Sequence, residues 1–192
     1  YRLNAGKPLI ARIEDDTARL MARWYYLRSS KGHADLAEFA AFRRDHPMWP
    51  SKKVLRRNAE LSALLKEPPA EEIFVFFADD PPQTGAGKAA LGAAYIATGE
   101  NERGTGLIRE AWRKHALGED AQEAIRERFD DLLRKADHKA RADWLLAQDD
   151  RDLTDDARRL KTELDARDQK SLDARVAEVR RSRRAGGLLT RL

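Results

Sequence analysis

The chain has 192 residues, of which 42% are hydrophobic and 36% are charged, and it contains no cysteine. This composition excludes a disordered or collagen-like chain, and the lack of thiols excludes disulfide scaffolds, thiolate zinc sites and cysteine nucleophiles. The 37 basic and 33 acidic side chains give a net charge of +4, which is typical of a solvated surface with many helical ion pairs. The chain begins at Tyr1 without a methionine, so we expect a piece of a longer protein, and no membrane span is predicted.

Short amphipathic helices separated by turn residues are predicted along the first half of the chain. Apolar residues recur there at intervals of three and four, and each stretch is bounded by a capping residue, a proline or a glycine. The predicted boundaries are Asp16 to Arg28, Asp35 to before Pro47, the N-cap Ser51 to Pro68, and the N-cap Thr84 to Gly99.

The helical pattern continues through the second half of the chain without a strand-like interruption. The apolar stripes are Leu107, Ile108, Ala111 and Trp112; Ala121, Ile125, Phe129 and Leu132; Ala142, Leu145 and Leu146; Ala157, Leu160 and Leu164; and Leu172, Val176 and Val179. Gly118 is expected to close the first of these helices, and Gly186 and Gly187 are expected to break the last.

One segment, residues 73–77 with the sequence Ile-Phe-Val-Phe-Phe, has the β-branched and aromatic composition of a strand. No partner strand is predicted elsewhere, and an isolated strand would leave its backbone groups unpaired. Glu71 and Glu72 immediately before it suit the N-terminus of a helix. We therefore predict a short buried helix.

About ten helices with short connections predict an all-α fold in which neighbouring helices pack as antiparallel pairs. Between Leu91 and Ala111, the residue types and spacings resemble a degenerate tetratricopeptide unit with its turn at Gly99. A strict 34-residue period is not kept along the chain. We predict a single α-superhelical domain over residues 1–192, an irregular α-solenoid of antiparallel helix pairs with a basic, frayed end at 181–192.

The sequence lacks the common catalytic signatures: a G-x-S-x-G nucleophile elbow, an H-E-x-x-H helix and a Walker A loop. Residues 85–88, Gly-Ala-Gly-Lys, lack the spacing and the Ser/Thr of a phosphate loop, and we interpret them as a loop leading into a helix. We expect no metal role for the histidines, because His33, His46 and His138 lie near turns and His115 near a helix C-terminus. No cofactor is predicted.

Adjacent aspartates occur four times and are interpreted as helix caps, because two carboxylates that share glycoside chemistry must converge from different elements. The pairs are Asp15-Asp16, Asp79-Asp80, Asp149-Asp150 and Asp155-Asp156. Aromatic side chains offer stacking faces for a ligand. Trp24 and Trp112 lie on apolar stripes and are predicted to pack between helices, whereas Trp49 and Trp144 are the candidate ligand contacts.

Several short motifs, in this order, resemble the superhelical region of bacterial soluble lytic murein transglycosylases over roughly residues 16–165. They are His46-Pro47-Met48-Trp49-Pro50, Leu55 to Glu60, Phe76-Phe77-Ala78 running into Pro81 to Gly85, Gly87-Lys88, Ala111-Trp112-Arg113, and Asp137 to Arg141 followed by Leu145-Leu146. Each motif alone has little specificity for this family, but their succession at these spacings is fairly specific.

The resemblance implies an array of helix pairs curled into a ring or horseshoe, a periplasmic location and a peptidoglycan partner. In that family a separate lysozyme-like domain cleaves the glycan strand with a glutamate that is followed directly by serine. No Glu-Ser pair occurs in this chain, so no catalytic residue is carried over. The expected function is a non-catalytic scaffold that positions peptidoglycan for an enzyme domain outside this sequence, or that contacts cell-wall partner proteins.

Two alternatives remain open on sequence grounds. A stand-alone tetratricopeptide-like adaptor would bind protein segments in a groove, as the unit between Leu91 and Ala111 suggests. Binding to nucleic acid would use the basic cluster at the end of the chain and would weaken steeply with salt. That cluster comprises Arg180, Arg181, Arg183, Arg184 and Arg191.

Overall fold

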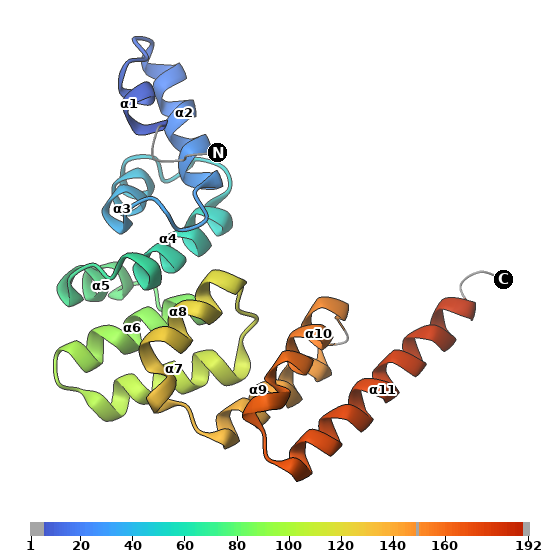
Figure 1. Cartoon of the computed structure of the whole chain (residues 1–192). Coiled ribbons are helices and arrows are strands. Elements are labelled where there is room, and N and C mark those ends of the chain that lie inside the picture. The colour runs from blue at the N-terminus through green and yellow to red at the C-terminus, as the bar shows by residue number, and fades with distance from the viewer. Residues whose placement is uncertain (1–5, 149, 190–192) are drawn as a thin grey trace.

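The computed structural model describes residues 6–148 and 150–189, which form α-helices joined by short loops (Figure 1). The structure is 78% helical and the described residues contain no strand, which confirms the all-α prediction. The helices are α1 (Gly6–Ala11), α2 (Asp16–Ser29), α3 (Leu36–Asp45), α4 (Lys52–Lys66), α5 (Ala70–Phe77), α6 (Gly85–Ala97), α7 (Asn101–Lys114), α8 (Glu119–Phe129), α9 (Lys135–Ala147), α10 (Arg151–Arg159) and α11 (Ala166–Leu189). Two 3₁₀ turns, η2 (Asp130–Leu132) and η3 (Leu160–Glu163), extend α8 and α10.

Neighbouring helices pack largely in chain order (Figure 1). The closest pairing is that of α6 with α7, and α4 and α5 both pack against α6. On the other side, α9 packs against α7, and α10 and α11 pack against α9. The helices α1 to α3 therefore lie at one end of this succession and α9 to α11 at the other.

Local capping explains where several helices begin. The side chains of Asp15, Thr84 and Asp150 each accept a hydrogen bond from a backbone N–H in the first turn of the following helix. Asp35 forms a capping box with Glu38, which accepts a hydrogen bond from the Asp35 N–H at 3.0 Å. These interactions satisfy N–H groups that have no partner inside the helix. The helix starts predicted near these residues are confirmed.

Some predicted boundaries are wrong in detail. Ser51 does precede α4, but it adopts a left-handed conformation with φ of 67° and its side chain makes no capping bond. Gly118 is the N-cap of α8 rather than the residue that closes α7. Gly186 and Gly187 do not break the last helix, because α11 continues to Leu189; a glycine inside a helix costs only about 1 kcal/mol relative to alanine.

The segment at residues 73–77 is helical, as predicted, and forms most of α5. Ile73 and Phe77 are buried, whereas the Val75 side chain between them is 78% exposed. Only one face of this apolar helix is therefore buried, so the expectation of a buried helix holds for one face alone.

The close approach of α6 and α7 depends on two glycines. A Cβ added at Gly92 would lie 2.8 Å from the Gly104 carbonyl oxygen, and a Cβ added at Gly104 would overlap the Gly92 carbonyl oxygen and Ile96. Because the obstructing atoms include backbone, the helices would have to move apart to admit a side chain.

Replacing Gly104 with alanine is therefore expected to lower the free energy of unfolding by about 1–3 kcal/mol, as measured by urea denaturation. Gly106 lies in the same helix and nothing obstructs a Cβ there, so Gly106→Ala is the matched control. That control is expected to raise the free energy of unfolding by about 0.5–1 kcal/mol. Equal effects at the two positions would contradict the proposed backbone contact.

Candidate functional site

Residues 46–50 lie in the loop between α3 and α4 and contribute to the walls of two cavities. We call the two cavities together the 46–50 groove. The apolar pocket has a volume of about 550 Å³ and includes Met21, Trp24 and Met48 in its wall. The basic pocket has a volume of about 590 Å³ and includes the five basic residues Arg43, Arg44, Lys52, Lys53 and Arg56. His46, Pro47 and Trp49 border both pockets.

The 46–50 loop is held in place at both ends. The indole N–H of Trp24 donates to the Pro50 carbonyl oxygen at 3.1 Å, and the Trp49 N–H donates to the His46 carbonyl oxygen at 3.1 Å. The rings of Phe42, His46 and Trp49 form a cluster with centroids 4.9–6.1 Å apart. Aromatic pairs with tilted or edge-on geometry add to the stability gained from burial. The groove is thus formed in the free protein.

The two tryptophans predicted as ligand contacts have different surroundings. Trp49 borders both pockets of the groove, so its position suits a ligand contact, and that role stays a prediction. Trp144 on α9 is half-buried and packs against the hydrophobic core. Trp112 is fully buried between helices, as its apolar stripe predicts.

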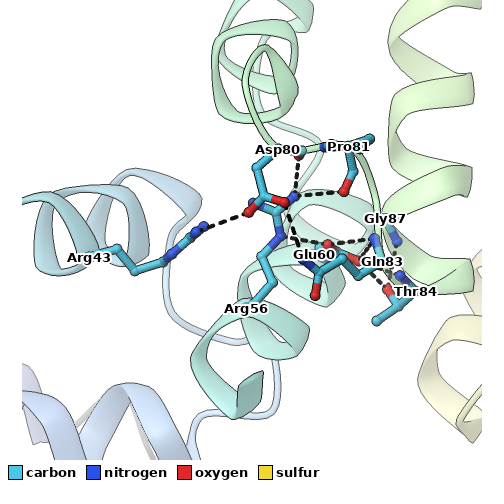
Figure 2. A network of polar contacts seen from close by, with 8 residues as sticks. All are labelled: Arg43, Arg56, Glu60, Asp80, Pro81, Gln83, Thr84 and Gly87. Atoms are coloured by element: carbon cyan, nitrogen blue, oxygen red, sulfur yellow. Dashed lines mark hydrogen bonds and ion pairs between the residues drawn. The ribbon is translucent and has the colours of Figure 1, made fainter. Parts of the chain in front are cut away.

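A buried carboxylate on α4, that of Glu60, holds the loop between α5 and α6 (Figure 2). Glu60 is fully buried and accepts hydrogen bonds from Arg56 Nε at 2.7 Å and from the Gln83 N–H at 3.0 Å. It also accepts from the Thr84 N–H at 2.7 Å and the Thr84 hydroxyl at 2.5 Å. Charge-assisted bonds of this kind are roughly twice as strong as neutral ones. A side chain at Gly87 would overlap the Glu60 carboxylate.

Arg56 connects this carboxylate to Asp80 (Figure 2). Its Nη2 donates to the Asp80 carbonyl oxygen at 2.6 Å, and its Nη1 lies 2.8 Å from the Asp80 carboxylate. Arg43 on α3 reaches the same carboxylate at 3.2 Å. The Arg56 guanidinium also lies 4.5 Å from the centre of the Phe76 ring, a cation–π distance. Two carboxylates therefore offset the charges of Arg43 and Arg56, and the network serves to join α3, α4 and the 78–84 loop.

The remaining basic side chains of the basic pocket differ in their pairing. Arg44 forms an exposed ion pair with its neighbour Asp45 at 2.8 Å. Lys52 and Lys53 are exposed and form no ion pair with any residue that the structure describes. The pocket's uncompensated positive charge is thus concentrated on these two lysines.

A second buried cation lies between α7 and α9. Arg141 is fully buried, and its Nη1 donates to the carbonyl oxygens of Trp112 at 2.7 Å and His115 at 3.2 Å. Its guanidinium lies 4.5 Å from the centre of the Trp112 ring, while Nε and Nη2 have no hydrogen-bond partner among the described residues. Burial lowers the pKa of Arg141 to about 10. Arg141 therefore joins the end of α7 to α9, and its guanidinium stacks on Trp112, the largest fully buried side chain.

Asp137 at the start of α9 is the acidic counterpart in this region. It is fully buried, pairs with Arg113, and lies 3.5 Å from Arg109 Nε. Its second oxygen accepts the Arg134 N–H at 2.8 Å, so it also caps α9. Sequence reasoning included Asp137 and Arg141 in a motif but did not predict that both charges are buried. The available signal for this burial was that both charged residues lie in one predicted helix that also carries an apolar stripe.

His138, which is predicted to lie near a turn, is in the first turn of α9. Its side chain is buried and meets the Trp112 ring edge-on at 5.6 Å. Burial lowers its pKa below the ordinary value of 6.5, and Glu163 opposes that shift. Burial likewise lowers the pKa of His115. Neither environment favours the charged form.

Since the pKa of His138 is lower in the folded state, the unfolded chain binds more protons as the pH falls below about 6.5. The free energy of unfolding is therefore expected to fall with acidification in that range. In His138→Phe, which keeps a ring against Trp112, this decline should be smaller. Urea denaturation of both proteins at pH 5 to 8 checks this. Parallel curves would show that His138 does not contribute.

The aspartate pairs only partly act as caps. Asp15 and Asp150 cap helices, whereas Asp80 pairs with two arginines and Asp155 and Asp156 lie inside α10, where they pair with arginines. The tertiary contacts of Arg43, Arg56 and Arg180 determine these different roles. Asp149 lies outside the described residues.

Within residues 6–148 and 150–189, no group of three or more His, Asp or Glu side chains is arranged to hold a metal ion. In the basic cluster at the end of the chain, Arg180 pairs with Asp155 at 3.0 Å and Arg181 is exposed. The side chains of Arg183, Arg184 and Arg191 lie outside the described residues.

Comparisons of the chain with protein-family models, with curated proteins and with solved structures give no match. Among the helices that the structure describes, none combines the length and the apolar character needed to cross a membrane.

Proposed function

We propose that this chain is a helical scaffold domain of a soluble lytic murein transglycosylase, which holds peptidoglycan for a separate lysozyme-like domain in the periplasm. The observation that carries the proposal is the ordered succession of motifs from His46 to Leu146. Cleavage of the glycan strand is assigned to the separate domain, since this chain has no Glu-Ser pair.

The positions of the motif residues support this proposal. Residues 46–50 form the loop of the groove, and residues 81–84 form the loop held by Glu60. Asp137 and Arg141 are buried charges that join α9 to α7. Buried motif charges that join helices in this way are expected of a scaffold, whose curvature and surface depend on the stacking of helix pairs. The irregular α-solenoid is part of the same proposal.

Purified chain mixed with insoluble peptidoglycan at low ionic strength tests this function. We expect the chain to sediment with peptidoglycan and not with cellulose, which controls for general adhesion to polysaccharide. We also expect its removal from the parent protein to slow the release of soluble fragments. A chain that neither sediments with peptidoglycan nor alters the activity of its parent would overturn the proposal.

A second candidate is a tetratricopeptide-like adaptor that binds protein segments. The specific observation in its favour is the close α6–α7 pairing across Gly92 and Gly104. The same sedimentation experiment separates the two candidates, because an adaptor has no reason to bind peptidoglycan.

A further inference from the structure

We propose that the 46–50 groove binds a short protein segment in which one large apolar side chain is flanked by acidic residues. The apolar side chain would enter the apolar pocket, and a neighbouring carboxylate would meet Lys52 and Lys53 in the basic pocket. This inference does not depend on the proposed function, because it concerns one loop and its two pockets.

The apolar pocket exposes large side chains that a folded protein usually covers. The Met48 side chain is 87% exposed and that of Met21 is 54% exposed, and both lie in the wall of this pocket beside Trp24 and Trp49. Contiguous exposed apolar surface is typical of an interaction site. Methionine is flexible and adapts to the shape of an apolar partner, while the tryptophans provide rigid contact area. The volume of about 550 Å³ is ample for one aromatic or aliphatic side chain.

The lysines of the basic pocket are located where helix stability disfavours them. Lys52 and Lys53 are the first two residues of α4, and the first turn of α4 contains no acidic residue. The positive end of the helix dipole lies there, so cations are unfavourable and acids would be stabilising. Since neither helix stability nor an ion pair within the described residues explains the lysines, we infer that they attract an external anion. Carboxylates provide the complementary charge.

The wall shared by the two pockets determines how the ligand is built. Because His46, Pro47 and Trp49 border both pockets, the apolar and acidic groups of the ligand must be neighbours. The Cα atoms of consecutive residues are about 3.8 Å apart, so two neighbouring residues of an extended chain meet this requirement. The loop is already held by Trp24 and by its ring cluster, so little ordering accompanies binding. A nucleic acid is less well matched, since Arg43, Arg44 and Arg56 are all paired with carboxylates.

The test uses a synthetic peptide with a central phenylalanine between two pairs of glutamates, titrated into the full chain by calorimetry. We expect a Kd below about 1 mM at low ionic strength, weakened by salt. Replacing the phenylalanine by alanine, or the glutamates by glutamines, should each abolish most of the binding. On the protein side, Lys52→Glu/Lys53→Glu should weaken binding about tenfold or more, and Met48→Ala should weaken it several-fold.

Lys135→Glu/Lys170→Glu is the matched control, because it makes the same change in net charge at two exposed lysines on α9 and α11. It should leave the Kd within about twofold of wild type. Acids at the start of α4 suit the helix dipole, so the groove variant should melt no lower than wild type, which separates lost binding from lost folding.

Equal weakening by the two double variants, or no binding of the peptide at 1 mM, would overturn the proposal. So would binding of single-stranded DNA that is tighter than binding of the peptide and equally sensitive to Lys52→Glu/Lys53→Glu. Sedimentation with peptidoglycan should be equal for Lys52→Glu/Lys53→Glu and Lys135→Glu/Lys170→Glu, because the two variants change the net charge equally. Loss of peptide binding by the groove variant alone then distinguishes this proposal from the scaffold function.

Discussion

Replacing Glu60 with alanine is expected to lower the free energy of unfolding by about 3–5 kcal/mol. The carboxylate is fully buried and is the shared acceptor of the Arg56 guanidinium, two backbone N–H groups and the Thr84 hydroxyl. Its removal leaves a buried cation with one fewer partner and three neutral donors unpaired, and each unsatisfied group costs free energy. This loss of free energy of unfolding measures the removal of the carboxylate, including the donors left unpaired. It does not measure the net contribution of the Arg56–Glu60 ion pair to stability.

Urea denaturation followed by far-UV circular dichroism measures this loss. Glu60→Gln keeps the shape and one acceptor oxygen, so an intermediate loss is expected. Glu123→Ala, at an exposed position inside α8, is the control and should change the free energy of unfolding by less than about 0.5 kcal/mol. A loss below about 1 kcal/mol for Glu60→Ala would contradict the assigned role.

Replacing Trp112 with alanine is expected to cost a similar amount, about 3–5 kcal/mol. The indole is completely buried, meets the His138 ring edge-on, and lies under the Arg141 guanidinium at 4.5 Å. Truncation to alanine removes the apolar contacts of the indole and leaves a cavity. It also takes away the ring on which the buried Arg141 guanidinium stacks. The effect should exceed that of a simple cavity of the same size.

Two further variants test this argument by the same denaturation experiment. Trp112→Phe retains an aromatic face for Arg141 and should cost less than Trp112→Ala. Trp144→Ala removes a tryptophan that is only half-buried, so its cost should be clearly smaller. Comparable losses for Trp112→Ala and Trp144→Ala would contradict the central packing role of Trp112.

Most helix boundaries could be predicted because they depend on neighbouring residues. Asp15, Asp35, Thr84 and Asp150 each bond to an N–H within the next few residues, and a capping contact of that kind depends on local spacing. The helix α1 was not predicted, since six residues give too short a stretch for a periodic pattern. Ser51 has the right residue type for a cap, but its backbone is left-handed and its side chain makes no capping hydrogen bond.

The candidate site was predicted only in its exposed part. Trp49 was identified as a candidate contact because it lies between Met48 and Pro50 in a loop, and in the structure it borders two pockets. Sequence analysis did not identify Lys52 and Lys53, although two cations in the first turn of a helix conflict with the helix dipole and were a detectable signal.

The sequence by itself determined the all-α class, the order of the helices and most of their boundaries, because period and capping are local. Only the tertiary structure decided which charges are buried. Glu60 meets Gln83 and Thr84, and Arg141 meets Trp112, across more than 20 residues of chain. Spacing in the sequence cannot distinguish these from solvated surface charges, because their burial depends on how distant helices pack. The same packing of α2 and α3 against the 46–50 loop forms the groove.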